Sequence, residues 1–378
     1  MNLFLLFRIV RWLRLFGGIF QKKSVCIGFS LIFGVPVLAL GIAWFCPQGS
    51  VRKMFLLLGN YWLGIFLYSL LIMGTADILS FFHYVIVKRR WKNKALAGGI
   101  CAVLVILISI WGIFQAQVIH VTPYEFTIEK KAGKMDSLHI ILASDLHLGY
   151  NIGYSHMKKM VEKINEQNGD IVVIAGDIFD NDYGAVSNPE SLAEILRGIR
   201  SKYGVYACYG NHDVEEKILA GFTFHDGQKK ESSSEMDCFL EKAGIRLLKD
   251  EAVLINKSFY LYGRPDAQRP GRGISMIKTA EELTKGLDLT KPVLVLEHEP
   301  GDFQALSDAG ADAVLCGHTH DGQMFPGNLI TGFLWENSYG YLRKDSLHTI
   351  VTSGVGLFGP NMRVGTIAEI CSIRIHFV

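Results

Sequence analysis

The chain has 378 residues, of which 49% are hydrophobic, and its formal net charge is +2. That charge implies neither nucleic acid nor an acidic partner, and the composition is too apolar for one soluble domain. The apolar surplus lies in residues 1–119, whereas residues 120–378 have an ordinary globular composition and enough length for a large core.

Residues 1–20 are predicted to form an amphipathic helix in the headgroup region of a membrane. Arg8, Arg11 and Arg14 recur at three-residue spacing, which places them along one face of a helix. Three arginines in the middle of the segment argue against a transmembrane span. They also interrupt the apolar core that a cleavable signal peptide would need.

Three longer apolar segments, at residues 24–45, 54–87 and 95–118, are predicted to supply membrane spans. The segment at 54–87 is too long for one hydrocarbon core, so its helix is expected to span in its first part and continue beyond the membrane. Asp77 and His83 lie in this segment. We expect them near the cytoplasmic interface, and a functional role at membrane depth is the alternative.

Basic residues flank these spans unevenly. Ten lysines and arginines precede the first span or separate the second from the third: Arg8, Arg11, Arg14, Lys22, Lys23, Lys88, Arg89, Arg90, Lys92 and Lys94. The loop between the first two spans has only two, Arg52 and Lys53. By the positive-inside rule the richer flanks face the cytoplasm, so three crossings place residues 120–378 outside it. A fourth span would reverse this orientation.

From residue 120 onward, strand patterns alternate with helix patterns. Strands are predicted at 121–130, 138–144, 170–175, 204–209, 253–255, 259–262, 292–296, 313–316, 349–351 and 366–375, and helices at 156–167, 189–200, 235–243 and 302–308. Residues 221–234, polar and glycine-rich, are expected to form a surface insertion before the third of these helices. The alternation predicts a layered α/β domain.

Polar residues directly follow five of the predicted strands. Asp145 and His147 follow the strand at 138–144, and their two-residue spacing lets them hold one ion together. The other four strand ends carry Gly176-Asp177-Ile178-Phe179-Asp180, Gly210-Asn211-His212-Asp213, Glu297-His298-Glu299-Pro300 and Gly317-His318-Thr319-His320. Oxygen and imidazole ligands at strand ends indicate a hydrolytic site for Mn²⁺, iron or Zn²⁺ rather than a structural zinc site.

These motifs, D-x-H, G-D-x-x-D, G-N-H-D, a later H and G-H-x-H in order over residues 145–320, resemble the calcineurin-like metallophosphoesterase superfamily. The segments G-H-T-H-D-G-Q at 317–323, S-G-V-G at 353–356 and P-N-M-R at 360–363 are similar to membrane-associated bacterial phosphoesterases of the YkuE/YaeI type. Vertebrate transmembrane metallophosphoesterases resemble the chain in having spans ahead of the catalytic domain. Asp321 stands where this family pattern would have glycine, and its charge could change substrate choice.

The resemblance implies an αββα four-layer sandwich as the catalytic domain at 120–378, preceded by an α-helical membrane domain at 1–119. It also implies two divalent metal ions, Mn²⁺, Fe²⁺/³⁺ or Zn²⁺. The first would be held by Asp145, His147, Asp177 and His320. The second would be held by Asp177, Asn211, His298 and His318, with Asp177 as the bridge.

In the implied mechanism, a metal-bridging hydroxide attacks phosphorus. His212 would protonate the leaving oxygen or stabilise charge in the transition state, and Asp180 would orient a neighbouring imidazole. Arg264 and Arg363 are expected to bind the substrate anion, although a loop salt bridge between Arg264 and Asp266 is equally open. His139, His156 and His348 are expected to be hydrogen-bonded or exposed rather than ligands.

The sequence thus predicts a membrane-anchored binuclear phosphoesterase in the cell membrane, with an extracytoplasmic catalytic domain and an amphiphilic or lipid-linked phosphoester as its substrate. No nucleic acid or protein partner is implied. One alternative is a cytoplasm-facing diphosphate hydrolase of a nucleotide-linked lipid, which requires the opposite topology. A second is a non-catalytic scaffold with the same fold.

Overall fold

The computed structural model describes residues 1–89, 93–216, 218–219, 222–223 and 230–378. The chain divides into two compact units, Met1–Phe114 with Gly359–Met362, and Gln115–Phe358 with Arg363–Val378. We call the first the helical unit and the second the sandwich unit.

The helical unit is built from α1 (Asn2–Leu13), α2 (Lys23–Phe45), α3 (Ser50–Val87) and α4 (Lys94–Gln115), with 3₁₀ turns at Arg14–Phe16 and Gly18–Gln21. Helices α2, α3 and α4 are long and apolar enough to cross a membrane. Helix α3 runs as one helix of 38 residues, as expected for a span that continues past the hydrocarbon core. Of the basic residues counted above, Arg90 and Lys92 lie outside the described residues.

Polar side chains connect α1 with the longer helices of the helical unit. Arg8 forms an ion pair with Asp77 of α3, so this acidic residue has a basic partner. The indole nitrogen of Trp62 in α3 donates to Asn2 at 3.2 Å. The indole nitrogen of Trp12 donates to the carbonyl of Ala95 in α4 at 3.0 Å. One of the three arginines predicted to lie in the headgroup region therefore pairs with a carboxylate of α3.

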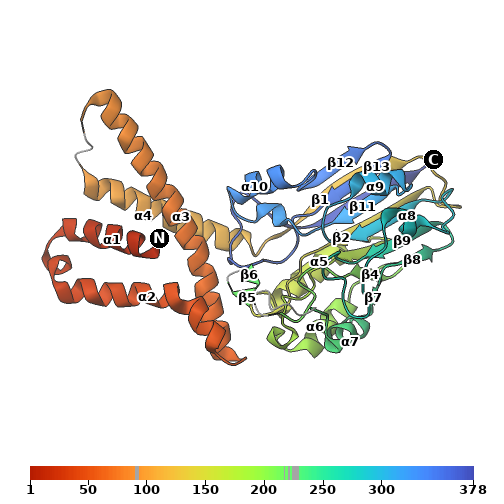
Figure 1. Ribbon diagram of the computed structural model, residues 1–378, viewed down its shortest axis with the longest axis horizontal. Helices are drawn as coiled ribbons and strands as arrows, with labels where there is room; N and C mark the ends of the chain where they lie inside the picture. Colours follow the sequence, from red (N-terminus) through yellow and green to blue (C-terminus); the bar gives the residue numbers. More distant parts are fainter. Residues whose placement is uncertain (90–92, 217, 220–221, 224–229) are drawn as a thin grey trace. The chain divides into compact units, whose positions relative to one another are not determined.

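Two six-stranded sheets form the centre of the sandwich unit (Figure 1). The first has the order β1 (Ile119–Ile128), β14 (Ala368–Phe377), β2 (Ser137–Ala143), β3 (Ile171–Ala175), β4 (Val205–Cys208) and β7 (Ile245–Leu247). The second has the order β12 (Gly340–Lys344), β13 (Leu347–Val351), β11 (Ala313–Cys316), β10 (Val293–Glu297), β9 (Phe259–Arg264) and β8 (Glu251–Ile255).

Three hydrophobic clusters define four layers. One lies between the first sheet and helices α5 (Tyr154–Gln167), α6 (Pro189–Arg197) and α7 (Ser234–Lys242). The second fills the space between the sheets and includes Leu142, Val173 and Leu294. The third lies between the second sheet and helices α8 (Ala280–Thr284) and α9 (Phe303–Asp308). The predicted αββα sandwich is therefore confirmed, preceded by helices apolar enough to span a membrane.

The direction of the strands gathers polar chain segments at one edge of the sandwich. Strands β2, β3, β4 and β7 run parallel in the first sheet, and β9, β10, β11 and β13 run parallel in the second. The carboxyl ends of parallel strands lie at a common edge, where α/β proteins place their sites. The predicted polar motifs follow β2, β3, β4, β10 and β11.

Some elements were not predicted from the sequence. They include β7, β12, α8, α10 (Gly327–Leu334) and the 3₁₀ turns η3 (Tyr183–Ala185) and η4 (His320–Gly322). Within the expected insertion at 221–234, residues 221 and 224–229 lie outside the described residues. The described part includes β6 (Phe222–Thr223), which pairs antiparallel with β5 (Ile218–Leu219).

Candidate metal centre

Six of the seven predicted ligands form two compact triads. In each triad one potential ligand atom from every residue lies within 4.8 Å of the others: Asp145, His147 and His320 in the first, and Asp177, His298 and His318 in the second. All six are buried except His318, which is half-buried. The triads combine residues from both sheets, so the site depends on how the two sheets pack.

The first triad joins the end of β2 to the loop after β11. The Nε2 atoms of His147 and His320 are 3.0 Å apart. Oδ1 of Asp145 lies 3.3 Å from Nε2 of His320. Both oxygens of Asp145 accept a hydrogen bond from the backbone nitrogen of His318 at 3.1 Å. Asp145 thereby fixes the loop that supplies the two later histidines.

The second triad begins at Asp177, after β3. Its Oδ2 atom lies 3.0 Å from Nε2 of His298 and 3.8 Å from Nε2 of His147 in the first triad. Nδ1 of His318 lies 3.2 Å from Nε2 of His298. The seventh predicted ligand, Asn211, places Oδ1 3.0 Å from this same Nδ1 atom. Asp177 therefore places one carboxylate oxygen within 3.8 Å of a histidine of each triad.

The donor set and its spacing fit metal ions. Ligand atoms at about 2.1 Å from one ion and about 90–110° apart lie about 3.0–3.4 Å from one another. The contacts of 3.0–3.3 Å between neighbouring ligand atoms match that spacing. Nδ1 of His298 donates to the carbonyl of Ala175 at 2.8 Å. This hydrogen bond turns Nε2 toward the site, as the outer partner of a metal-binding histidine does.

Five predicted ligands have left-handed backbone conformations, which residues other than glycine seldom adopt. They are Asp145, His147, Asp177, His318 and His320, with φ between 46° and 73°. Each such residue costs about 1–2 kcal/mol. Strain of this kind persists where the surrounding structure enforces it, and it clusters at functional sites.

Glycines leave the space that the ligands occupy. A Cβ atom on Gly210 would overlap the carboxylate of Asp177 and the ring of His298. One on Gly317 would overlap Ser144 and the carboxylate of Asp145. The glycines that precede the polar residues at these two strand ends are therefore required by close approach.

The pKa values show that the site favours positive charge beside Asp177. Burial by itself raises the pKa of Asp177, but His298, His212 and His147 together lower it well below its usual value. Burial lowers the pKa of His298, and the Asp177 carboxylate overcomes that effect and raises it to about 10. For His318, burial and the charge of His298 lower the pKa to about 3. Protonated His298 beside Asp177 thus disfavours a proton on the imidazole of His318.

His212 lies at the rim of the second triad. Its backbone nitrogen donates to Oδ1 of Asp177 at 2.8 Å. Its Nδ1 atom contacts Oδ1 of Asn181, which leaves Nε2 as the ring atom for a substrate. Burial lowers the pKa of His212 to about 4, so donation of a proton requires the negative charge of a bound phosphoester to raise that pKa.

Asp180 and Asp213 support the loop after β3. Oδ1 of Asp180 lies 3.5 Å from Nδ1 of His147, where it can orient the ring. Asp213 is fully buried and accepts hydrogen bonds from the backbone nitrogens of Phe179 and Gly210 at 2.8 and 2.7 Å. No role was predicted for Asp213 or Asn181, although Asp213 is a carboxylate within the G-N-H-D motif.

The two arginines predicted to bind substrate have partners inside the protein. Arg264 is buried and pairs with Glu297 at 2.9 Å and with Asp302 at 3.0 Å. A salt bridge was the alternative interpretation, with Asp266 as the expected partner. Arg363 is fully buried. Its guanidinium donates to the carbonyls of Ser353, Gly356 and Ile367 at 2.7–2.9 Å.

The guanidinium of Arg363 also lies close to the first triad. Its Nη2 atom is 3.4 Å from Nδ1 of His320. Burial lowers the pKa of Arg363 to about 10, so the side chain keeps its charge at neutral pH. This geometry supports a positioning role, in which Arg363 holds the loops around His320. Substrate binding by Arg264 or Arg363 stays a prediction.

The histidines outside the motifs have partners of their own. Nε2 of His139 contacts Ser372 at 2.8 Å. Nε2 of His156 contacts the carbonyl of Val355 at 2.9 Å. His348 bonds Tyr341 at 2.8 Å and stacks on Phe126. These contacts agree with the expectation that the three histidines are hydrogen-bonded.

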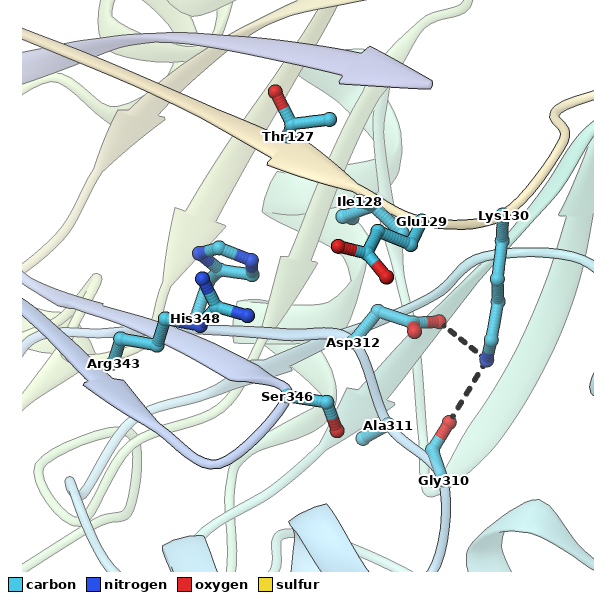
Figure 2. Close-up of a pocket in the computed structure, with 10 residues that line it drawn as sticks. All are labelled: Thr127, Ile128, Glu129, Lys130, Gly310, Ala311, Asp312, Arg343, Ser346 and His348. Carbon is cyan, nitrogen blue, oxygen red and sulfur yellow. Dashed lines mark hydrogen bonds and ion pairs between the residues drawn. The ribbon is translucent and has the colours of Figure 1, made fainter. Parts of the chain in front are cut away.

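A separate cavity of about 300 Å³ lies where β1 ends and β11 begins, at the edge of the sandwich opposite the triads. Figure 2 shows the residues that line it. Lys130 lines the cavity, and its Nζ atom donates to Asp312 at 2.8 Å and to the carbonyl of Gly310 at 3.3 Å. Glu129, Arg343 and His348 also line it. Its lining contains none of the predicted ligands, so this cavity is distinct from the candidate metal centre.

Comparison with known proteins shows the family. Residues 138–322 match the family model described as calcineurin-like phosphoesterase. A transmembrane protein with metallophosphoesterase domain from Danio rerio is 30% identical over 363 residues, covering 86% of this chain and 77% of that protein. An uncharacterized metallophosphoesterase from Aquifex aeolicus is 30% identical over 243 residues, covering 64% of this chain and 86% of that protein.

A further relative is the UDP-2,3-diacylglucosamine pyrophosphatase LpxG of Chlamydia trachomatis. It is 25% identical over 238 residues, covering 56% of this chain and 71% of that protein.

The chain therefore belongs to the calcineurin-like phosphoesterase family, as its motifs predicted. It is a metal-dependent phosphoester hydrolase. Membership of this family therefore favours the predicted enzyme over the alternative of a non-catalytic scaffold. Its apolar helices and its transmembrane relatives show that it is associated with a membrane.

The positioning role of Arg363 predicts that Arg363→Met lowers stability. The buried carbonyls lose charged donors, which should cost about 2–4 kcal/mol and lower the unfolding temperature by about 5–10 °C. Thermal unfolding of the detergent-purified protein measures this change. Arg374→Met, at an exposed position of β14, is the control and should unfold near the wild-type temperature. An Arg363→Met protein that unfolds like wild type but shows a raised KM would indicate substrate binding instead.

Proposed function

We propose that the protein is a membrane-anchored phosphoesterase that hydrolyses phosphomonoester or phosphodiester bonds with two divalent metal ions, which are Mn²⁺, iron or Zn²⁺. The observation that carries this proposal is the pair of adjoining carboxylate and imidazole triads, with Asp177 in contact with both. Such a constellation suits two cations held close together by a shared carboxylate.

The proposed ligands are assigned by contact. Asp145, His147, Asp177 and His320 would hold the first ion. Asp177, Asn211, His298 and His318 would hold the second. When bound, such ions lower the pKa of water and neutralise the charge of phosphoryl oxygens.

The chain's own residues then complete the site. His212 presents Nε2 to the leaving oxygen or to transition-state charge, and its ring is held by Asn181 and by its backbone bond to Asp177. Asp180 holds the ring of His147 in orientation. Asp321 is half-buried near the site and could influence substrate choice through its charge.

The proposed organisation is a membrane domain at 1–119 and a catalytic domain at 120–378. Charge bias around the spans favours a multi-pass anchor with the catalytic domain outside the cytoplasm. An anchored enzyme meets substrates that are themselves held in the membrane, so we propose a lipid-linked phosphoester as the substrate class.

The proposal predicts metal-dependent hydrolysis of bis-p-nitrophenyl phosphate or p-nitrophenyl phosphate by detergent-purified protein with added Mn²⁺. Asp177→Asn should abolish turnover because both triads lose their common carboxylate. His212→Ala should reduce kcat by about 10²–10⁴-fold while bound metal remains. His376→Ala changes a half-buried histidine that pairs with Glu125 in β1, so it should keep wild-type turnover. Equal rates for wild type and Asp177→Asn would contradict the proposal.

A second candidate function is favoured by one of the relatives. LpxG is named as a pyrophosphatase of UDP-2,3-diacylglucosamine. A diphosphate hydrolase of a nucleotide-linked lipid could use the same triads. It would act on a cytoplasmic substrate, so the catalytic domain would have to face the cytoplasm.

Topology separates the two candidates. We predict that alkaline phosphatase fused after Val378 is active and that green fluorescent protein fused there is not fluorescent, because these reporters work outside and inside the cytoplasm, respectively. The same fusions placed at Gln48, between α2 and α3, should give the same pattern, since that connection is also predicted to lie outside. Fluorescence at Val378, whichever reporter works at Gln48, would favour the diphosphate hydrolase.

A further inference from the structure

Helix α10 exposes an apolar surface on the sandwich unit. Leu329, Ile330, Phe333 and Leu334 are 54%, 58%, 91% and 71% exposed, respectively. The preceding Phe325 is 48% exposed. The helix, Gly327–Leu334, contains no charged residue. A patch of this kind is unusual on a surface that meets water.

The arrangement of residues on α10 is inverted relative to a helix on a soluble protein. At about 100° per residue, the four large apolar side chains fall within an arc of about 140°. The opposite side carries Gly327, Asn328, Thr331 and Gly332. Asn328 and Thr331 are half-buried, whereas the apolar side chains are exposed. The polar side chains are thus less exposed than the apolar ones, which is the pattern of a helix whose outer medium is apolar.

Helix α10 follows the last two predicted metal ligands in the chain, and the residue at its end contacts one of them. It begins seven residues after His320, and Trp335, which ends it, packs edge-on against the ring of His318 at 5.4 Å. Thr319, between these two histidines, donates from Oγ1 to the carbonyl of Ser338 at 2.6 Å. The apolar surface therefore belongs to the edge of the sandwich that carries the site.

The chain also enters the sandwich unit at this edge. Helix α4 ends at Gln115, and only three residues, 116–118, separate it from the start of β1 at Ile119. Ile119 pairs with Ala368, and three residues further along β14, Cys371 pairs with Leu142 near the end of β2. Because β14 and β2 are antiparallel, the entry point is level with the residues that follow β2. The connection that follows α4 therefore joins the sandwich unit at the edge where Asp145 lies.

We propose that α10 is a membrane-surface element whose apolar face inserts into the boundary between headgroups and acyl chains, beside the candidate metal centre. Tryptophan at the end of the helix suits this depth, since its ring combines apolar area with a polar nitrogen. Inserted in this way, α10 holds the site at the level of lipid phosphates. The inference rests on the proposed membrane anchor and deepens the proposed substrate class, but it does not depend on activity.

A spin-label measurement on the full chain tests the insertion. The protein is placed in nanodiscs of equal parts phosphatidylcholine and phosphatidylglycerol, with a nitroxide on Phe333→Cys. The cysteines that are not buried are first replaced by serine: Cys26, Cys46, Cys101 and Cys238. Lys134→Cys, exposed at the opposite edge before β2, is the matched control. Collisions of the label with lipid-soluble oxygen and with a water-soluble nickel chelate are then compared.

Insertion predicts that the label at position 333 collides more with oxygen than with nickel, and that the label at position 134 shows the reverse. A label at 333 that favours nickel would overturn the proposal, because α10 would then face water. A label at 333 shielded from both reagents would also overturn it, because a protein partner would then cover the helix.

A second readout separates this inference from the proposed function. Leu329→Gln with Phe333→Gln should reduce hydrolysis of a phosphoester lipid in nanodiscs by about tenfold or more. Turnover of bis-p-nitrophenyl phosphate should stay at the wild-type rate. Equal loss on both substrates, or none on either, would contradict the role of α10. A wild type inactive toward every substrate would count against the proposed function, while the nitroxide measurement would still decide the insertion.

Discussion

Asp177 belongs to the second triad and also contacts the first, and the segments around it have to accommodate a buried carboxylate on a residue with a left-handed backbone conformation. One oxygen contacts His298, and the other accepts the backbone hydrogen bond of His212. Gly210 leaves room for the carboxylate, and Asp213 ties the loops after β3 and β4 together. Holding so much polarity and strain in place requires a rigid frame, which the two packed sheets provide.

The sequence predicted the sandwich and the clustering of the ligands, because buried parallel strands appear as apolar runs and their carboxyl ends share one edge. The short strand β7 and helix α10 lacked such patterns. The surroundings of charged side chains could not be predicted either. Arg363 and Arg264 look alike as phosphate binders in a sequence, but the fold surrounds the first with carbonyls and pairs the second with Glu297. Only tertiary packing decides between these outcomes.

Two features of the chain indicate contact with a membrane: the long apolar helices α2, α3 and α4, and helix α10, whose apolar side chains are exposed. These features are independent, since the spans are identified by length and hydropathy and α10 by the exposure of its apolar side chains. The register of β1 connects them, because it brings the chain into the sandwich at the edge that carries the triads. A hydrolytic site placed at headgroup depth explains why an ordinary phosphoesterase domain would carry an exposed apolar helix beside its ligands.

The central claim is that the two triads hold two metal ions that share Asp177. Anomalous X-ray scattering at the manganese edge, from crystals grown with Mn²⁺, tests it most directly. The account predicts two manganese peaks, one among Asp145, His147 and His320 and one among Asp177, His298 and His318. The Asp177→Asn protein should lose at least one of them. Saturating Mn²⁺ that gives no peak at either triad, or peaks only elsewhere on the molecule, would contradict the account.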